Sequence, residues 1–592
     1  MQTDGPMIIL AGAGSGKTRV ITHKVLYLTQ KGVDPFNILC VTFTNKAANE
    51  MKERIQRILS STTTVATFHS LCARILRIEA KNLDISQKFV IYDTQDQLDA
   101  VKEAMKLLNI SPKEYKPSSI LTTISQAKNQ LISEKEYPSL ARGFFQETVA
   151  KVYTIYQKLL KENEALDFDD LLIKTVGLFI LNPNILEKYQ DRFRYILVDE
   201  YQDTNRAQYR LTKLLSQKWQ NICVVGDFSQ SIYSWRGADF QNLIKFKTDF
   251  KNTKTFKLSQ NYRSTQKILD AAYSIISKNT THPILSLWTR NKGGEEITVY
   301  EARNEQDEAK YLACQISDSN YSDFAVLYRT NAQSRVIEEA FLHYGIPYVL
   351  VGGTRFYERK EIKDVLSYLR LLENPKDMVS YKRAEKLGKT RLQKFLDFQN
   401  SLAKIEDQQT IDLLDKTLKA TDYLSFYDEK DEEERERLEN IKELRSVAIQ
   451  FPNLTNFLEN VALVEQEYPS TSLRAGMPDG TIDKQKANAV TLMTLHAAKG
   501  LEFPIVFMVG MEEGIFPHSR SLMEKHELEE ERRLCYVGIT RAKKKLFLTY
   551  ATRRLFFGQR TTNMPSRFII ELPDASMQTN RYNKDDDIPE YL

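Results

Sequence analysis

Residues 11–18 combine the side chains and the spacing that bind nucleotide phosphates. They read Ala-Gly-Ala-Gly-Ser-Gly-Lys-Thr and follow the apolar run 7–10, which is typical of a buried strand. Glycines in such a loop allow tight turns, so that consecutive backbone N–H groups face phosphate oxygens. Lys17 can neutralise the β- and γ-phosphates, and the Thr18 hydroxyl can hold Mg²⁺. We therefore predict that ATP or GTP binds to Ala11, Gly12, Ala13, Gly14, Ser15, Gly16, Lys17 and Thr18.

A second apolar run supplies two carboxylates. Residues 195–205 read YILVDEYQDTN, so Asp199 and Glu200 follow a predicted strand directly. Ligands of parallel α/β sheets bind at the carboxyl ends of the strands, where these two residues would lie. We predict that Asp199 holds Mg²⁺ through water and that Glu200 orients and deprotonates the attacking water.

The next predicted strand, 222–225, leads into Gly-Asp-Phe-Ser-Gln-Ser-Ile-Tyr-Ser-Trp-Arg-Gly. Gln230 at its end can hydrogen-bond a γ-phosphate or the lytic water. Tyr233, Trp235 and Arg236 place stacking surfaces and a guanidinium beside that amide, which suits contact with nucleic-acid bases. The alternative is that these aromatic rings are core residues.

The composition indicates a multidomain intracellular protein and little more. The chain has 592 residues, which favours three or four domains. Its five cysteines are scattered without a CxxC pair, which argues against a zinc site or a disulfide framework and fits the cytoplasm. The net charge of +5 permits an anionic polymer as partner. No apolar run is long enough to span a membrane, and no secretory signal is recognisable.

Alternation of short apolar runs with helix-compatible segments predicts an α/β fold. The predicted strands are 38–41, 195–198, 222–225, 324–328, 505–509 and 546–550, and the predicted helices include 17–30, 47–59 and 208–215. Helix-prone stretches interrupt this pattern twice, so the same plan of an α/β core with a helical insertion occurs two times. The acidic end of the chain has a composition typical of disorder.

The motifs in their order resemble those of superfamily 1 DNA helicases of the UvrD/PcrA/Rep type over nearly the whole chain. Besides the phosphate loop and the Asp-Glu motif, the matching segments are 42–48 (TFTNKAA), 67–70 (TFHS), 167–170 (DFDD), 258–263 (LSQNYR), 490–503 (VTLMTLHAAKGLEF) and 530–542 (EERRLCYVGITRA).

The resemblance implies two RecA-like P-loop cores, each with a mainly helical insertion. The first core would comprise residues 1–85 and 166–257, with its insertion at 86–165. The second core would comprise 258–374 and 486–579, with a shortened insertion at 375–485, and 580–592 would form a disordered tail.

The resemblance also implies roles for residues that spacing alone does not assign. Tyr262 would stack on adenine and Glu502 would lie near the ribose, while Arg263 and Arg541 would be arginine fingers. With Lys17, Glu200 and Gln230, these two arginines would be the catalytic residues. The residues expected to contact DNA are Phe43, Thr44, Asn45, Lys46, Phe68, His69, Phe168, Tyr233, Trp235, Arg236, Arg335, His496 and Phe557. Phe168 and Phe557 could instead be core residues, and Arg541 could instead be a surface residue of a basic helix with Lys543, Lys544 and Lys545.

The expected function is an ATP- and Mg²⁺-dependent helicase that moves 3′→5′ on single-stranded DNA and separates duplexes at junctions of single- and double-stranded DNA. The chain departs from the family pattern before the phosphate loop, where a Gln that contacts adenine is missing. Either the selection of adenine is relaxed and rests on stacking by Tyr262 alone, or the start is truncated, which we expect. Because the second insertion is short, a DNA-stimulated translocase with little unwinding activity is an alternative. A P-loop kinase and a non-catalytic DNA-binding module are further alternatives.

Overall fold

The computed structural model describes residues 4–57, 59, 63–316, 320–402, 404–405, 407–429, 431–467, 488–573 and 577–581. The chain forms two compact units. Unit 1 comprises residues 1–262 and 281–290, and unit 2 comprises 263–280 and 291–592. Both units contain a parallel sheet with helices, so the predicted α/β fold with two cores is confirmed.

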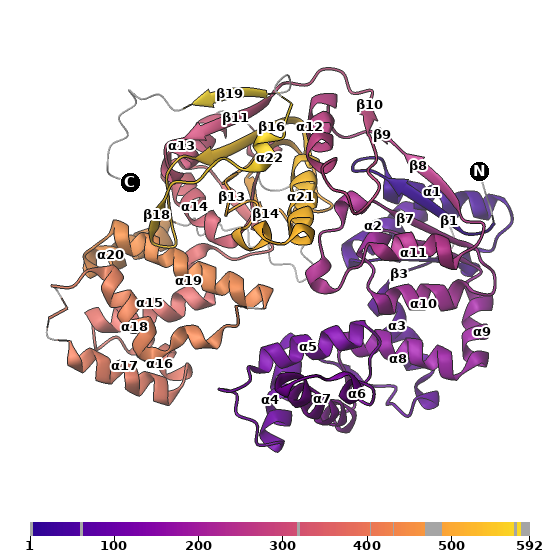
Figure 1. Cartoon of the computed structure of the whole chain (residues 1–592), viewed down its shortest axis with the longest axis horizontal. Coiled ribbons are helices and arrows are strands. Elements are labelled where there is room, and N and C mark those ends of the chain that lie inside the picture. Colours follow the sequence, from indigo (N-terminus) through magenta and orange to yellow (C-terminus); the bar gives the residue numbers. More distant parts are fainter. Residues whose placement is uncertain are drawn as a thin grey trace. The chain divides into compact units, whose positions relative to one another are not determined.

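Unit 1 is built on a six-stranded sheet in the order β3-β2-β6-β7-β1-β8 (Figure 1). Every pairing in it is parallel. The strands are β1 (Met7–Ala11), β2 (Ile38–Thr42), β3 (Thr64–Thr67), β6 (Tyr195–Val198), β7 (Ile222–Gly226) and β8 (Lys254–Leu258). Parallel order brings the carboxyl ends of β1, β2, β3, β6 and β7 to one edge of the sheet, where the predicted motifs begin.

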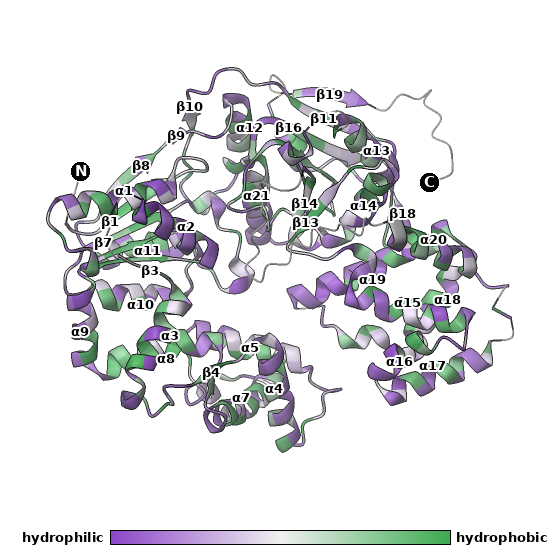
Figure 2. Ribbon diagram, turned by 180° about the vertical axis from the view of Figure 1, so that it is seen from behind, coloured by the Kyte–Doolittle hydropathy of each residue, from purple (hydrophilic) through white to green (hydrophobic). Residues whose placement is uncertain are grey.

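The strands β1, β2, β6 and β7 are nearly continuous apolar runs because both faces of the sheet are covered there, whereas the edge strand β8 is largely exposed. Along β2, Leu39 and Val41 point into one hydrophobic core, whereas Ile38 and Cys40 point into the other. Figure 2 shows the hydrophobic colour along β1 and β7. The covering helices are α1 (Lys17–Gln30), α2 (Asn45–Gln56), α3 (Phe68–Ile78), α8 (Phe168–Leu181), α9 (Pro183–Arg192), α10 (Arg206–Ser216) and α11 (Gln241–Asp249).

The first insertion is helical, as the sequence predicts. It contains α4 (Thr94–Leu107), α5 (Pro117–Asn129), α6 (Tyr137–Leu140) and α7 (Phe144–Glu162), with the two-residue strands β4 (Val90–Ile91) and β5 (Ala165–Leu166) at its ends. These helices have a hydrophobic core of their own, centred on Tyr153, Tyr156 and Ile120. Helix α5 also packs against α8 of the sheet domain.

Unit 2 contains a seven-stranded parallel sheet in the order β13-β14-β12-β15-β16-β11-β19. Its strands are β11 (Ile297–Ala302), β12 (Phe324–Tyr328), β13 (Tyr348–Val351), β14 (Val490–Thr494), β15 (Phe503–Met508), β16 (Ala542–Ala551) and β19 (Met577–Arg581). The helices around it are α12 (Gln266–Ile276), α13 (Glu305–Ile316), α14 (Ser334–His343), α21 (Lys525–Ile539) and α22 (Arg567–Ile570). A hairpin of β17 (Arg554–Phe556) and β18 (Gln559–Thr561) follows β16.

The second helical region has its own core, which starts upstream of residue 375. Phe356, Tyr357 and the apolar face of α15 (Lys360–Glu373) belong to this core. The other helices are α16 (Met378–Lys386), α17 (Lys389–Ser401), α18 (Thr410–Thr421), α19 (Glu432–Gln450) and α20 (Leu454–Glu467). The end of the predicted insertion, 468–485, lies outside the described residues.

One predicted boundary is wrong at its first two residues. Asn580 and Arg581, expected in a disordered tail, pair with Tyr300 and Glu301 as the end of β19. Residues 582–592 lie outside the described part of the chain. Within the described residues, no helix is both long and apolar enough to cross a membrane.

Candidate functional site

The phosphate loop connects β1 to α1 with the backbone that the sequence predicts. Gly14 and Gly16 have φ values of +63° and +88°, which favour glycine. Gly12 is required for space instead, because a Cβ there would lie 2.4 Å from a methyl carbon of Leu287. Gly16 is the N-cap of α1 and provides no side-chain cap. The first N–H groups of α1 are therefore oriented for an anion.

Thr18, Asp199 and Glu200 lie together at the carboxyl edge of the sheet. The Thr18 hydroxyl donates to Asp199 Oδ2 at 3.2 Å, and Lys17 Nζ lies 3.7 Å from Glu200 Oε1. Burial, and then the charge of Glu200, raise the pKa of Asp199 to about 7. Glu200 has a φ of +49°, a left-handed conformation that costs energy for a residue with a side chain. Such strain at a carboxylate beside a phosphate loop fits a residue positioned for chemistry.

These residues fit Mg²⁺. Mg²⁺ in nucleotide sites uses one or two carboxylates with phosphate oxygens and water. Thr18 and Asp199 supply a hydroxyl and a buried carboxylate at this position. Among the described residues, no group of three or more His, Cys, Asp or Glu side chains forms a cage for another metal.

A hydrogen-bond relay connects Glu200 to Gln230. Gln202 Nε2 donates to Glu200 Oε2 at 2.6 Å, and Gln202 Oε1 accepts from the backbone N–H of Asp227 at 3.0 Å. Gln230 Nε2 then donates to Asp227 Oδ2 at 2.5 Å. Gln202, Asp227 and Gln230 are all buried. The relay joins the ends of β6 and β7 and holds both predicted catalytic side chains.

Tyr262 is held next to the phosphate loop. Its backbone N–H donates to Gly14 O at 3.0 Å, and Asn261 Nδ2 donates to Ala13 O at 2.7 Å. Asn261 is buried, whereas the side chain of Tyr262 is exposed. This arrangement leaves the Tyr262 ring available for stacking.

In unit 2, Arg263 and Glu502 form an ion pair. Arg263 Nε lies 2.7 Å from Glu502 Oε2, and Lys543 Nζ lies 2.8 Å from Glu502 Oε1. Burial opposes the ionisation of Glu502, but the hydrogen bond from Lys543 and the charge of Arg263 lower its pKa to about 2. Arg263 also donates to Thr540 O at 2.9 Å. The two residues that the sequence assigned to one nucleotide therefore contact each other directly.

Arg541 is buried, which neither interpretation of the sequence anticipated. It follows α21, and its guanidinium donates to Val537 O, Leu501 O and Thr540 Oγ1 at 2.9–3.1 Å. It is therefore not a solvated residue of a basic surface helix. Its role as an arginine finger stays a prediction.

Several residues expected to contact DNA lie after β2 and β3 at the same edge of the sheet. Thr44, Asn45 and Lys46 are exposed at the start of α2. The half-buried ring of His69 contacts the exposed Phe168 edge to face, with centroids 5.8 Å apart. Burial lowers the pKa of His69, so its ring is neutral at neutral pH.

The expectation for Phe68 is corrected by the structure. Its ring is 2% exposed and belongs to the core of unit 1. There it packs against the half-buried Phe43, with centroids 5.6 Å apart. Because β3 ends at residue 67 and α3 turns back onto the sheet, the first side chain of the helix points inward. Phe68 supports Phe43 instead of meeting a base itself.

Trp235 and Arg236 form an exposed ledge after β7. They belong to the 3₁₀ turn η5 (Ser234–Arg236), and the Arg236 guanidinium lies 4.4 Å from the centre of the Trp235 ring. The Tyr233 ring lies 5.9 Å from the same guanidinium. Trp235 is 39% exposed, so it is not a core residue. Trp235 and Arg236 are thus exposed to solvent, with the guanidinium over one face of the Trp235 ring.

A buried polar cluster that the sequence did not predict joins the first insertion to the start of α8. Lys128 of α5 pairs with Asp167 at 2.5 Å and Asp170 at 3.0 Å, and Tyr156 donates to Asp167. Asn129 bridges Asp169 and Asn205, which is the N-cap of α10. The motif around Phe168 is therefore fixed from the insertion as well as from the sheet.

In unit 2, the expectation for Arg335 is also corrected. Its side chain is 1% exposed and pairs with Glu443 at 2.8 Å and Glu339 at 2.9 Å, so it joins α14 to α19. His496 is half-buried in the turn after β14. Phe557 stacks on Phe556 with centroids 3.8 Å apart, and its φ of +56° lies at the turn of the β17–β18 hairpin. Of the three residues expected to contact DNA here, His496 and Phe557 keep side-chain surface for a strand of DNA, whereas Arg335 does not.

Some of the site residues that we did not predict lie in recognisable sequence motifs, and others do not. Gln202, Asp203 and Asn205 belong to the motif YQDTN, and Asp227 precedes Gln230 in the next motif. Polar residues in such runs suggest mutual hydrogen bonds, but pairing Gln202 with Asp227 needs the strand order. Lys128 and Asn129 lie in an ordinary amphipathic helix, and no local pattern indicates their partners.

Comparison with known proteins shows the family of the chain. The UvrD/REP helicase N-terminal domain model matches residues 1–251, and the UvrD-like helicase C-terminal domain model matches 256–416 and 385–553. The chain is 46% identical to the ATP-dependent DNA helicase PcrA of Bacillus subtilis, over 98% of this chain and 86% of that protein. It is 44% and 43% identical to the PcrA proteins of Staphylococcus epidermidis and Staphylococcus aureus, with the same coverage.

Proposed function

The chain belongs to the UvrD/PcrA-type DNA helicases, and from this premise we propose that it moves 3′→5′ along single-stranded DNA and separates duplex DNA at the expense of ATP. The observation that carries the proposal is the relay in unit 1. It links a strained carboxylate beside the phosphate loop to the buried Gln230, which precedes the exposed Trp235–Arg236 ledge by a few residues along the chain.

The residues of unit 1 divide the chemistry of hydrolysis among themselves. The loop N–H groups and Lys17 bind the phosphates, and Glu200 takes the proton of the attacking water while Gln202 holds its carboxylate. Thr18 and Asp199 would hold Mg²⁺, which supplies charge compensation on the phosphates when bound. Tyr262 would stack on adenine. We assign no residue of the chain to the polar edge of the adenine base.

Coupling to DNA follows from the contacts of Gln230. When the γ-phosphate leaves, the side-chain amide of Gln230 would change its hydrogen-bond partner. This change would alter the hydrogen bonds of Asp227 and the position of the turn that follows Gln230. That turn carries Tyr233, Trp235 and Arg236. The two aromatic rings and the planar guanidinium can stack on any base. Sequence-independent movement along a single strand is the expected result, with junctions of single- and double-stranded DNA as the substrate.

The arginines of unit 2 make hydrolysis depend on both units. We assign Arg263 and Arg541 to the developing charge on the γ-phosphate. In this structure Arg263 is paired with Glu502, and Arg541 donates to backbone carbonyls of its own unit. Both must exchange these partners to reach a nucleotide, so their engagement would be a step that nucleotide and DNA control.

We place this activity in the cytoplasm, since all five cysteines are free thiols. The test is the steady-state rate of ATP hydrolysis with and without oligo(dT). Strong stimulation by the oligonucleotide supports the motor. Turnover that oligo(dT) does not change favours a kinase-like NTPase, and binding without turnover favours a non-catalytic DNA-binding module.

The alternative of a translocase with little unwinding is tested separately. Displacement of streptavidin from a biotinylated single strand reports translocation, and strand displacement from a tailed duplex reports unwinding. Streptavidin displacement without duplex separation would select the alternative.

A further inference from the structure

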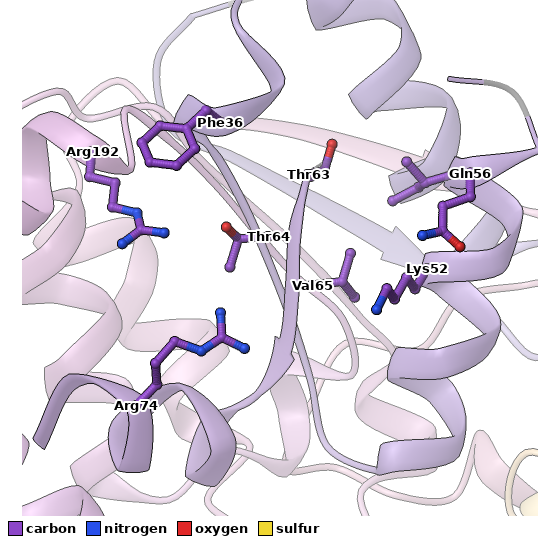
Figure 3. A pocket seen from close by; sticks show the side chains of 9 residues that line it. Phe36, Lys52, Gln56, Thr63, Thr64, Val65, Arg74 and Arg192 are labelled. Carbon is purple, nitrogen blue, oxygen red and sulfur yellow. The ribbon is translucent and has the colours of Figure 1, made fainter. Parts of the chain in front are cut away.

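At the opposite end of the unit 1 sheet from the phosphate loop lies a pocket lined by three cations that form no ion pair within the described part of the chain. Its volume is about 260 Å³, and Figure 3 shows the side chains that line it. They are Phe36, Lys52, Ile55, Gln56, Thr63, Thr64, Val65, Arg74 and Arg192. None of these residues belongs to the site described above.

The sheet topology separates this pocket from the nucleotide. Phe36 lies in the 3₁₀ turn that precedes β2, and Arg192 is the last residue of α9, shortly before β6. Thr63 directly precedes β3. All three positions are at the amino ends of parallel strands, whereas the phosphate loop and the candidate DNA contacts follow carboxyl ends. A ligand here would therefore be different from an ATP at the phosphate loop and from the strand that Trp235 would contact.

The charge of the pocket is uncompensated. Lys52, Arg74 and Arg192 form no ion pair with a carboxylate anywhere in the described chain, and no acidic side chain lines the pocket. Three cations around one cavity repel one another, and their mutual repulsion would be relieved by an anion.

Two buried polar atoms in the pocket lack partners. Arg192 Nε and Thr63 Oγ1 are both shielded from solvent and accept or donate no hydrogen bond among the described residues. Leaving such atoms unsatisfied costs free energy, which a bound ligand would recover.

The shape of the pocket suits a phosphate group. The Arg192 guanidinium lies 4.6 Å from the centre of the Phe36 ring, so the ring fixes its plane. Arg74 and Arg192 extend toward the same space beside Thr64 (Figure 3). Planar guanidinium groups bind phosphate oxygens in pairs, and a threonine hydroxyl adds a donor. Lys52 and Gln56 line the pocket from α2, which packs against β3.

We propose that this pocket is a second anion site that binds the phosphate group of a ligand other than the hydrolysed ATP and the tracked strand. The phosphate belongs either to a soluble phosphate compound or to a further segment of nucleic acid. Arg74 and Arg192 are its direct ligands, and Lys52 adds charge.

Two measurements distinguish these sources. In the first, pyrophosphate is titrated calorimetrically into the full chain carrying Lys17→Ala, so that the phosphate loop does not contribute. Arg74→Gln and Arg192→Gln should each weaken binding about tenfold, the size of one lost charge-assisted hydrogen bond. Arg57→Gln is the matched control, because Arg57 is a highly exposed residue at the end of α2 outside the pocket.

In the second, the affinity for labelled oligo(dT) is measured against salt concentration. This arm rests on the proposed function. Loss of a phosphate contact should reduce the salt slope by about 0.7 in Arg74→Gln and leave it unchanged in Arg57→Gln. Thermal unfolding without ligand checks the fold, and Lys52→Gln, at an exposed position, provides a further variant if Arg192→Gln is unstable.

A selective effect of the pocket variants on pyrophosphate identifies a soluble phosphate ligand, and a selective effect on the salt slope identifies nucleic acid. If all pocket variants equal Arg57→Gln in both measurements, the proposal is overturned. The proposal is also overturned if an acidic peptide that pairs with the edge strand β3 competes for the pocket while neither pyrophosphate nor oligo(dT) does. Failure of the wild-type chain to bind oligo(dT) at all would contradict the proposed function and leave the pyrophosphate result to decide the pocket.

Discussion

Gln202 donates to Glu200 at 2.6 Å while its amide oxygen accepts from the backbone of Asp227 at 3.0 Å. One buried side chain thus fixes the proposed general base with respect to the strand that carries Gln230. The space behind it is filled, since a Cβ on Gly226 would lie 2.8 Å from Gln202 Oε1. Gln202 cannot turn away from Glu200 without losing its second hydrogen bond.

Replacing Gln202 by Met should therefore impair hydrolysis more than nucleotide binding. Methionine has a similar shape but makes neither hydrogen bond, so Glu200 loses its orientation. We expect kcat to fall about 10–100-fold, as when an orienting partner of a functional group is removed. Steady-state ATPase assays and binding of a fluorescent ADP analogue measure the two effects. Gln217→Met, at an exposed position after α10, is the control, and equal kcat values for both variants would contradict the role of Gln202.

Trp235 and Trp219 provide a matched test of the DNA ledge. The two are 39% and 38% exposed, and each lies under an arginine, Arg236 at 4.4 Å and Arg194 at 4.9 Å. Trp235→Ala should weaken binding of oligo(dT) by about 1–3 kcal/mol, one stacking contact, without changing the salt slope. Trp219→Ala should have no effect on DNA affinity. Fluorescence anisotropy at several salt concentrations measures both.

Lys46→Ala is the complementary variant in that series, because Lys46 is exposed and cationic. It should flatten the salt slope by about 0.7. Equal losses of affinity in Trp235→Ala and Trp219→Ala would remove the ledge from the DNA path.

The charge of Asp169 makes part of the stability depend on pH. Burial, and then the charge of Asp167, raise the pKa of Asp169 to about 6, above its value in the unfolded chain. The folded state therefore holds a proton more tightly, so this contribution to stability is complete below about pH 4 and is lost as the pH rises through about 6. Asp169→Asn cannot ionise, so its unfolding temperature relative to wild type should rise between about pH 5 and about pH 8.

The control for this pH dependence is Asp99→Asn. The hydrogen bond from Lys102 lowers the pKa of Asp99, so its replacement should give no such rise. Differential scanning fluorimetry at the two pH values makes the comparison. A relative unfolding temperature of Asp169→Asn that falls with pH would show that the carboxylate is stabilised in the folded state.

Arg335 should affect stability instead of DNA binding. Its side chain and that of Glu443 are 1% and 3% exposed, so Arg335→Ala leaves a carboxylate buried without its partner. We expect a loss of about 3–5 kcal/mol in the stability of unit 2. Denaturant unfolding measures this loss. A folded Arg335→Ala variant with normal stability and weakened DNA binding would restore the role that the resemblance implied.

The sequence predicted the elements of the site better than the directions of its side chains. The strand, the loop and α1 follow from apolar runs, glycines and helix propensity, which act over a few neighbouring residues. Whether Phe68 or Arg335 faces solvent depends on how α3 and α14 pack on their sheets, and Phe168 is exposed although it too begins a helix. The Gln202–Asp227 contact depends on strand order, and the Asn129–Asn205 bridge joins residues of separate domains. Such long-range pairs leave no local pattern.

Strand displacement from duplexes with a 3′ or a 5′ single-stranded tail tests the central claim, that hydrolysis at Glu200 drives 3′→5′ movement on DNA. We expect the wild-type chain with ATP and Mg²⁺ to separate the 3′-tailed duplex and not the 5′-tailed one. Glu200→Gln should bind both the nucleotide and the tail yet displace no strand, because general-base loss costs about 10²–10⁴-fold in rate. Preference for the 5′ tail, or undiminished displacement by Glu200→Gln, would contradict it.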